Sequence, residues 1–367
     1  FIYGLSPGLD IRYSDDSDVG QIRQRFEQML ALGCRAFALL FDDIPGTLDG
    51  ADRMRWDSPA SAQCHVANAI LAWLREREAS ARLLFCPTAY CGRMVHAGLG
   101  GPDYLAIVGR DLLPEIDIFW TGPEIISREI TVAHLQGVRG VLRRKPVIWD
   151  NLHANDYDGR RFFCGPYSGR PPELRGEVAG LLSNPNCEWP LNYVPLRTLA
   201  EFVRCSRTWN ARSAYLSAMR EWLLAFATVS GPVDPADLIL FGDCYYLPHE
   251  EGPEATSLYE AARDLLERDP AGWGEDAVAF RSRTRRLGDF CGRMTELRDR
   301  PLFHALSRRV WELREELHLL DRYVEQASAD VRDTPVRSDS HLEGTFRGGM
   351  VARLQGLLTQ SRDGTFT

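Results

Sequence analysis

The stretch RAFALLFDDI, Arg35 to Ile44, decides the fold. Its apolar run has the length of a buried strand, and two carboxylates follow the run directly. Before it lies VGQIRQRFEQMLALG, residues 19–33. The apolar residues there recur at helical spacing: Ile22, Phe26, Met29 and Leu30. Amphipathic helices that alternate with short apolar strands predict a parallel α/β sheet.

The same unit recurs along the first half of the chain. Each recurrence is a short apolar run that ends in polar, Gly or Pro residues. The runs are FIYGLSPG (1–8), RAFALLFDDI (35–44), RLLFCPTAY (82–90), IDIFWTGP (116–123), PVIWDN (146–151) and, more weakly, GLLSNPN (180–186). Six parallel strands are therefore expected, separated by helices.

The ends of these runs favour a TIM-type (β/α)8 barrel over an open sheet. A barrel builds its site from the carboxyl ends of most of its strands, whereas an open doubly wound sheet concentrates the site at one switch point. Almost every run here ends in a polar cluster. Since a barrel needs eight strands and six are visible, the first two βα units are expected upstream of Phe1.

The second half of the chain reads as helical. After Pro301, apolar residues alternate spacings of four and three: Leu306, Val310, Leu313, Leu317, Leu320 and Val324. This stripe predicts an all-α helical bundle over residues 205–367, after a barrel domain over residues 1–204. The alternative interpretation of the stripe is a homodimer seam. The Gly-rich stretch at 337–349 is expected to be a loop between the last two helices.

Composition excludes several classes of protein. The 367 residues carry 43 Lys+Arg and 51 Asp+Glu, a net charge of −8, which removes the attraction to a nucleic-acid backbone. No apolar run approaches the ~18–20 residues of a membrane span. Nine cysteines without C-x-x-C pairs disfavour a disulfide scaffold or zinc site, and we expect a reducing, cytoplasmic location.

Common cofactor and nucleophile motifs are missing as well. The sequence holds no G-x-G-x-x-G, Walker A, H-E-x-x-H or G-x-S-x-G, and its histidines are not grouped for metal ligation. We therefore expect hydrolysis without a cofactor or a metal.

Asp42 and Asp43 are the sharpest candidate for chemistry. Mutual repulsion and partial burial at a strand end should raise the proton affinity of one carboxylate relative to the other. Glycosidases that use two carboxylates place them about 5–9.5 Å apart, across the scissile bond. Adjacent residues cannot easily straddle a sugar ring, so the pair suits a substrate that supplies its own nucleophile, such as a 2-acetamido group. The alternative is a pair of solvated turn residues or helix caps.

A second cluster lies in VIWDNLHANDYDG, residues 147–159. A calcium loop with Gly159 at its sixth position would begin at Ala154 and end at Gly165, and neither offers a side-chain oxygen. Carboxamides and carboxylates beside Trp149 suit a sugar pocket instead. Tyr90 and Asn184 end two further strands and can reach the same mouth.

Several motifs in register carry a family resemblance. FIYGLSPGLDI, FALLFDDI, FCPTAYCG, WTGP, PVIWDNLHANDYD, GPYSGR and SNPNCEW resemble, in this order, the catalytic domain of the protein O-GlcNAcases, the family-84 glycoside hydrolases. The match runs from Phe1 to about Tyr193. It implies a (β/α)8 barrel that removes β-linked N-acetylglucosamine from Ser or Thr of proteins, through an oxazoline and with net retention.

The resemblance also implies roles for single residues. Asp43 would be the general acid and later the base, while Asp42 would orient the acetamido N–H. Trp149 and Asn151 would line the pocket floor beside the acetamido group, and Tyr90 would lie near the reacting centre.

Three further residues complete this set. Asp156 and Asn184 would hydrogen-bond sugar hydroxyls, and Asp150 would be mainly structural. The expected partners are O-GlcNAc-modified proteins or GlcNAc-containing glycans.

The chain departs from the family in one respect. Relatives carry a Gly-Phe-Tyr-Gly strand end and a Lys-bearing strand end before the SPG strand, and this sequence has neither. We therefore expect the chain by itself to be unstable, inactive or both. The alternatives to a protein-directed enzyme are a hexosaminidase that acts on glycan oligosaccharides and a non-catalytic sugar-binding or scaffold remnant. After residue 205 the chain resembles the family's stalk only in its all-α character, which permits a homodimer through that region.

Overall fold

A computed structural model describes residues 1–206, 208–329, 336–337 and 348–366. The chain divides into two compact units. The first comprises Phe1–Asn151 and Gly169–Asn184, and the second comprises Leu152–Ser168 and Pro185–Thr367. The loop expected at 337–349 falls mainly on residues 338–347, which lie outside the described residues.

The first unit is built on a six-stranded parallel sheet. Its strands are β1 (Tyr3–Leu5), β2 (Ala36–Leu40), β3 (Arg82–Cys86), β4 (Asp117–Trp120), β5 (Val147–Asp150) and β6 (Gly180–Ser183). Each strand pairs in parallel with the next one along the chain, so the spatial order is the sequence order. The six predicted strands are confirmed. An open doubly wound sheet reverses its strand order part-way, and this sheet does not.

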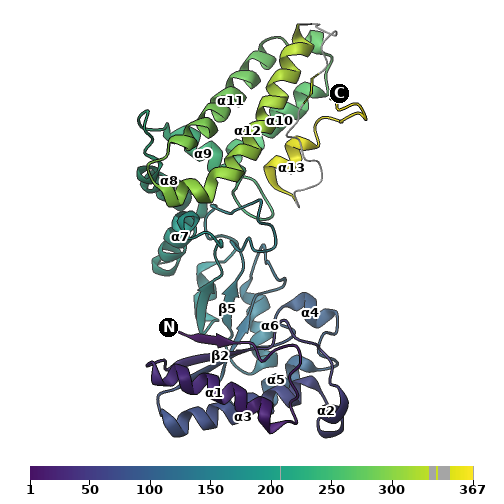
Figure 1. The fold of residues 1–367 in the computed structure, drawn as a ribbon, viewed down its shortest axis with the longest axis vertical. Helices are drawn as coiled ribbons and strands as arrows, with labels where there is room; N and C mark the ends of the chain where they lie inside the picture. The colour runs from purple at the N-terminus through teal and green to yellow at the C-terminus, as the bar shows by residue number, and fades with distance from the viewer. Residues whose placement is uncertain (207, 330–335, 338–347, 367) are drawn as a thin grey trace. The chain divides into compact units, whose positions relative to one another are not determined.

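Helices connect consecutive strands of this sheet. They are α1 (Asp16–Ala31), α2 (Gly50–Arg55), α3 (Pro59–Arg77), α4 (Gly92–His96), α5 (Tyr104–Asp111), α6 (Val132–Leu142) and the 3-10 helix η1 (Pro172–Gly176). Side-chain caps begin the longer ones: the Asp15 carboxylate accepts from Ser17 N, and the Ser58 hydroxyl accepts from Ser61 N. Figure 1 shows α1, α3 and α5 together on one side of β2.

The two faces of the sheet carry separate apolar clusters because side chains alternate along a strand. Phe37, Leu39, Leu83 and Phe85 point to the outer face, where helices α1, α3, α5 and α6 pack. The inner face carries strand residues instead: Ala38, Leu84, Cys86, Phe119 and Val147. The first unit is therefore a parallel half-barrel with its helices on the outer face.

The second unit is mainly helical. Its longer helices are α7 (Tyr193–Arg204), α8 (Ala211–Trp222), α9 (Pro235–Cys244), α10 (Pro253–Leu266), α11 (Gly274–Arg293), α12 (Arg300–Ser328) and α13 (Gly349–Gln355). Its 3-10 helices are η2 (Trp189–Asn192), η3 (Leu223–Phe226), η4 (Pro270–Gly272) and η5 (Met294–Glu296). Helices α11 and α12 run side by side (Figure 1).

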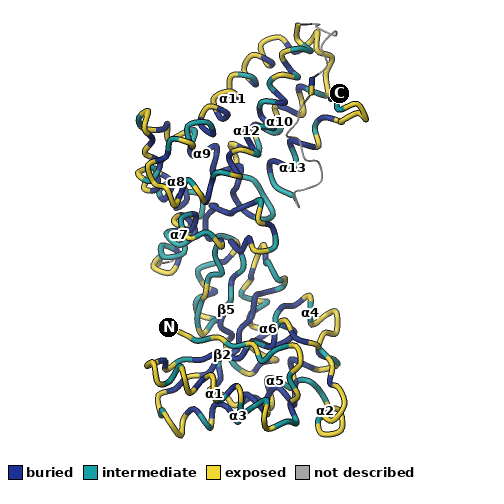
Figure 2. Tube along the Cα trace, in the orientation of Figure 1, coloured by how far each residue is buried: buried dark blue, intermediate teal, exposed yellow. Residues whose placement is uncertain are grey.

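The apolar stripe predicted after Pro301 lies on α12. Its members are all buried: Leu306, Val310, Leu313, Leu317, Leu320 and Val324. Buried and exposed stretches alternate along α11 and α12 (Figure 2), as expected for helices packed by one face. Among the described residues, none of the helices combines the length and the hydropathy that crossing a membrane requires.

Candidate active site

Strand β2 delivers Asp42 and Asp43 to the carboxyl edge of the sheet. Phe41 prolongs the strand by one residue, since its N–H donates to the Cys86 carbonyl at 2.9 Å, and its ring is buried on the outer face. The alternation of strand residues then turns Asp42 toward the inner face. Asp42 is partly buried and Asp43 is exposed.

Burial raises the pKa of the Asp42 carboxyl. Hydrogen bonds from its own backbone amide and from the Cys86 thiol act in the opposite direction, while the negative charge of Asp43 raises this pKa further. The net shift is upward, which is the direction predicted from the adjacent carboxylates. Asp42 is thereby a better proton acceptor than an ordinary aspartate.

Tyr90 follows β3 beside the two aspartates. Burial raises the pKa of its phenol, and the charges of Asp43 and Asp42 add to the effect. The hydroxyl therefore keeps its proton and can donate a hydrogen bond. The Tyr90 carbonyl accepts from Thr121 N at 3.0 Å, which ties the end of β3 to the end of β4.

A buried polar network supports the loop that carries Tyr90. Gln63 from α3 donates to the Thr88 hydroxyl at 2.9 Å and accepts from the hydroxyl of Tyr104 on α5. The Tyr104 oxygen in turn accepts from Thr88 N at 2.9 Å. All three side chains are buried and hydrogen-bonded, so the network is rigid. It fixes the backbone at Thr88, two residues before Tyr90. Sequence reasoning missed Gln63 and Tyr104, because neither belongs to a strand end.

Strand β5 places alternate residues on opposite faces. Trp149 packs on the inner cluster together with Tyr90, edge-on to Phe119 with ring centroids 5.3 Å apart. Asp150 therefore points to the outer face and Asn151 to the inner face.

On the outer face Asp150 is engaged by Arg170. The guanidinium makes two hydrogen bonds to the carboxylate, at 2.8 and 2.7 Å, and both side chains are buried. Arg170 also donates to the Ser127 carbonyl at 2.9 Å and to the Arg128 carbonyl at 3.0 Å. Asp150 thus anchors two loops to the end of β5. Arg170 is the last residue of the GPYSGR motif quoted above, but the sequence did not indicate that it would pair with Asp150.

On the inner face Asn151 and Asn184 form an amide pair. Asn184 Nδ2 donates to Asn151 Oδ1 at 3.0 Å, and Asn151 Nδ2 donates to the Ile125 carbonyl at 2.8 Å. Asn184 N also donates to the Asp150 carbonyl at 2.8 Å. The ends of β5 and β6 are locked together in this way, and both amides lie on the face that carries Asp42.

Seven of the eight predicted site residues therefore belong to the first unit, at the carboxyl ends of β2, β3, β5 and β6. Asp156 belongs to the second unit, where it is exposed and accepts from Tyr157 N at 3.1 Å. His153, also in the second unit, is buried, and its Nε2 is 3.0 Å from the Gly165 carbonyl oxygen. That contact gives His153 a structural role in its loop. Within the described ranges, His, Cys, Asp and Glu side chains form no metal-binding group of three.

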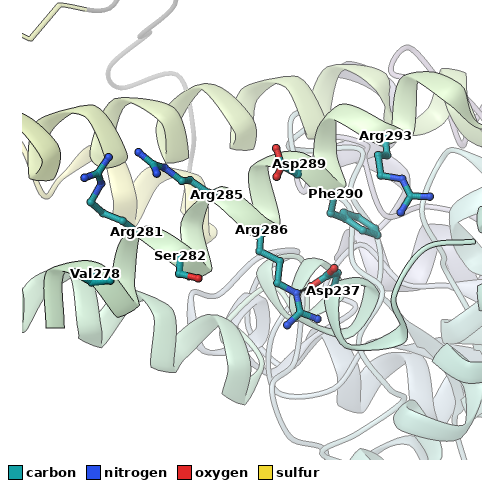
Figure 3. Close-up of a pocket in the computed structure, with 9 residues that line it drawn as sticks. All are labelled: Asp237, Val278, Arg281, Ser282, Arg285, Arg286, Asp289, Phe290 and Arg293. Carbon is teal, nitrogen blue, oxygen red and sulfur yellow. Dashed lines mark ion pairs between the residues drawn. The ribbon is translucent and has the colours of Figure 1, made fainter. Parts of the chain in front are cut away.

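A groove of about 490 Å³ in the second unit is a competing candidate for a binding site. It is lined by Asp237, Val278, Arg281, Ser282, Arg285, Arg286, Asp289, Phe290 and Arg293. Figure 3 shows Arg286 directed toward Asp237, and their ion pair is 2.5 Å long.

The other arginines of this groove are also engaged. Arg281 and Arg285 pair with Asp321 of α12 at 2.9 and 3.0 Å, and Arg293 donates to the carbonyls of Gly231 and Pro232. These contacts bind α9, α11 and α12 to one another. We therefore interpret the groove as part of the ion-pair framework of the bundle.

Comparison with known proteins places the half-barrel in a family. The family model NAGidase, described as beta-N-acetylglucosaminidase, matches residues 1–230, which is more than half of the chain. The chain belongs to the NAGidase family. The resemblance to the protein O-GlcNAcases seen in the sequence motifs is confirmed.

The NAGidase assignment agrees with individual relatives. "Protein O-GlcNAcase" of Rattus norvegicus and that of Mus musculus are each 46% identical over 204 residues, which is 56% of this chain and 22% of theirs. The chain thus spans about a fifth of the length of these relatives. A mutant O-GlcNAc hydrolase from Thermobaculum terrenum matches the fold with a TM-score of 0.77 and 24% identity, over 91% of this chain and 70% of that one.

Proposed function

We propose that this chain carries the catalytic site of a β-N-acetylglucosaminidase that removes GlcNAc linked to Ser or Thr of proteins. The observation that carries the proposal is the pair Asp42–Asp43 at the inner carboxyl edge of a NAGidase half-barrel, with the pKa of Asp42 raised. The relatives' name, protein O-GlcNAcase, supports the choice of substrate.

The proposed reaction uses the substrate's own acetamido group. Asp43 donates a proton to the glycosidic oxygen as the bond from C1 to that oxygen breaks. The acetamido carbonyl oxygen attacks C1 from the other face, and Asp42 accepts the N–H proton, so that a neutral oxazoline forms. Water then opens the oxazoline, with Asp43 as the base and Asp42 returning its proton. Two inversions at C1 give net retention.

The raised pKa of Asp42 supports this division of roles. A carboxylate with increased proton affinity polarises an amide N–H more strongly and so makes the carbonyl oxygen a better nucleophile. Tyr90 keeps its phenolic proton and can donate to the oxazoline or to the leaving oxygen. Trp149, Asn151 and Asn184 would contact the sugar from the same inner face, and Asp156 would bind a hydroxyl.

We also propose that the six strands belong to a TIM-type (β/α)8 barrel. Parallel strands in sequence order, helices on the outer face and site residues at the carboxyl edge support this architecture. A reducing, cytoplasmic location and a homodimer through the helical region stay predictions.

The test is hydrolysis of an aryl β-N-acetylglucosaminide, with and without a thiazoline that mimics the oxazoline. It is run on this chain and on a version lengthened at its amino end by the two βα units that a closed barrel needs. Hydrolysis that the thiazoline blocks supports the proposal, and activity in the lengthened version alone supports the barrel as well. A folded protein that binds the thiazoline without hydrolysis would favour the sugar-binding interpretation.

A further inference from the structure

Helix α12 reaches back to the loop that carries Asp156, and Arg309 makes the contact. Its side chain is only 5% exposed. Arg309 Nη2 donates to the Gly159 carbonyl at 3.1 Å and to the Arg161 carbonyl at 3.3 Å. The same nitrogen donates to Glu188 Oε1 at 2.7 Å. One guanidinium thus joins α12 to two segments of the second unit.

Glu188 links Arg309 to Asn155, because each of its two carboxylate oxygens accepts from one of them. Its Oε2 accepts from Asn155 Nδ2 at 3.0 Å, and Asn155 Oδ1 accepts from Cys187 N at 2.8 Å. Burial alone would raise the pKa of Glu188, but the hydrogen bonds from Arg309 and Asn155 outweigh it and the pKa is lowered. Glu188 is therefore ionised and paired, and Asn155, which is 2% exposed, is held from both sides.

The turn between Asn155 and Arg161 is braced by its own contacts. Asp158 N donates to the Asn155 carbonyl at 3.0 Å, and the Asp158 carboxylate accepts from Arg161 Nε at 2.9 Å. Arg160 forms an ion pair with Glu312, one helical turn along α12 from Arg309. Arg309 and Glu312, three residues apart on α12, therefore both hold the end of this turn at residues 159–161.

Asp156 is the exposed carboxylate of this turn, since Asp158 is buried. It follows Asn155 directly, and its charge is close enough to Cys187 to raise the pKa of that thiol, after burial and Glu188. The carboxylate of Asp156 is exposed to solvent, whereas Asn155 before it and residues 159–161 after it are held. A binding group on a rigid support loses less conformational entropy when a ligand binds.

We propose that Arg309 is a positioning residue which, through Glu188 and Asn155, holds the Asp156 turn in the geometry that binds a sugar hydroxyl. This inference rests on the proposed function, in which Asp156 binds a sugar hydroxyl. Sugar affinity would then depend on a helix that lies about 150 residues further along the chain than the turn itself.

The test is a double-mutant cycle on the active form of the protein. One arm removes both charges of the pair, Arg309→Met with Glu188→Gln, because removal of one alone leaves a buried charge unpaired. The other arm is Asp156→Asn. We expect each arm to raise KM by roughly tenfold with kcat nearly unchanged, as for loss of a charge-assisted hydrogen bond. Combining the arms should add little further.

Two comparisons separate positioning from stability. Arg281→Met with Asp321→Asn removes a charge pair between α11 and α12, and we expect it to leave KM unchanged. Arg309→Lys keeps the charge and should restore part of the affinity. Amide exchange of Asp158 and Arg161 should speed up in the Arg309→Met/Glu188→Gln variant and not in the control.

Each outcome bears on one claim. If the unsubstituted protein neither hydrolyses the aryl glycoside nor binds the thiazoline, the proposed function fails and the positioning role fails with it. If that protein is active but the KM effects of the two arms add fully, or turn exchange is unchanged, only the positioning role is overturned. The positioning role would also be overturned if the Arg281→Met/Asp321→Asn control raised KM as much as the Arg309→Met/Glu188→Gln variant does.

Discussion

At the scale of the residue, Asp42 and Asp43 are adjacent in sequence and differ in environment. Asp43 is exposed at the strand end, where a leaving group can reach it. We predict that Asp43→Asn lowers kcat/KM by roughly 10²–10⁴ for substrates with poor leaving groups, since general acid catalysis has that magnitude. Activated aryl glycosides, which need little protonation, should be affected far less. Equal losses for both kinds of leaving group would contradict the general-acid role.

Replacement of Asp42 should lower activity and raise stability. We predict that Asp42→Asn lowers kcat by about 10²–10³ for every leaving group, because the amide cannot take up the acetamido proton. It should also raise Tm at neutral pH, since the folded state holds the Asp42 proton more tightly than the unfolded state.

The sign follows from that raised pKa. The folded state binds more protons than the unfolded one between the two pKa values, so the free energy of unfolding falls as pH rises through this window. The stabilisation by Asp42→Asn should therefore shrink as the pH is lowered toward the pKa of an unfolded aspartate. Thermal unfolding at several pH values checks this, and a gain that grew in acid would rule out the assignment.

At the scale of the element, the pair Asp150–Arg170 holds the end of β5. Arg170→Met would remove the guanidinium that neutralises the buried Asp150 carboxylate, and we predict a loss of about 3–5 kcal/mol in the free energy of unfolding. Adding Asp150→Asn should recover part of that loss. Urea denaturation measures both.

An exposed pair in the same unit provides the matched control. Arg139→Met breaks a contact with Glu177 in which the arginine is 52% exposed, and we expect a change of at most about 1 kcal/mol. Similar costs for Arg170→Met and Arg139→Met would show that the buried pair is not an anchor.

At the scale of the whole molecule, ligand binding should stabilise one unit. The proposed site residues other than Asp156 lie in the first unit. We predict that the thiazoline at a hundredfold excess over its Kd adds about 2.7 kcal/mol to the free energy of unfolding. Chemical denaturation followed by tryptophan fluorescence checks this. Where two transitions are resolved, the one that includes the half-barrel should move, and a shift confined to the helical transition would contradict the site.

Alternation along single strands made much of the site predictable. Asp42, Trp149, Asn151 and Asn184 follow from the period of two, and the strand ends were visible as polar residues after apolar runs. The same rule directs Asp150 to the opposite face, in line with the structural part that the family resemblance implied for it.

What the sequence by itself determined is local: six apolar runs and their order, the carboxylate pair after β2, and the buried stripe of α12. Each of these features consists of residues close together in the chain, and the α12 stripe is periodic, so neighbouring residues are enough to reveal it. The tertiary structure alone decided that Arg170 would meet Asp150, 20 residues away, and that Arg309 would meet Glu188, 121 residues away. Arginines are common on this chain, and only the packing of distant elements selects which of them is buried against a carboxylate.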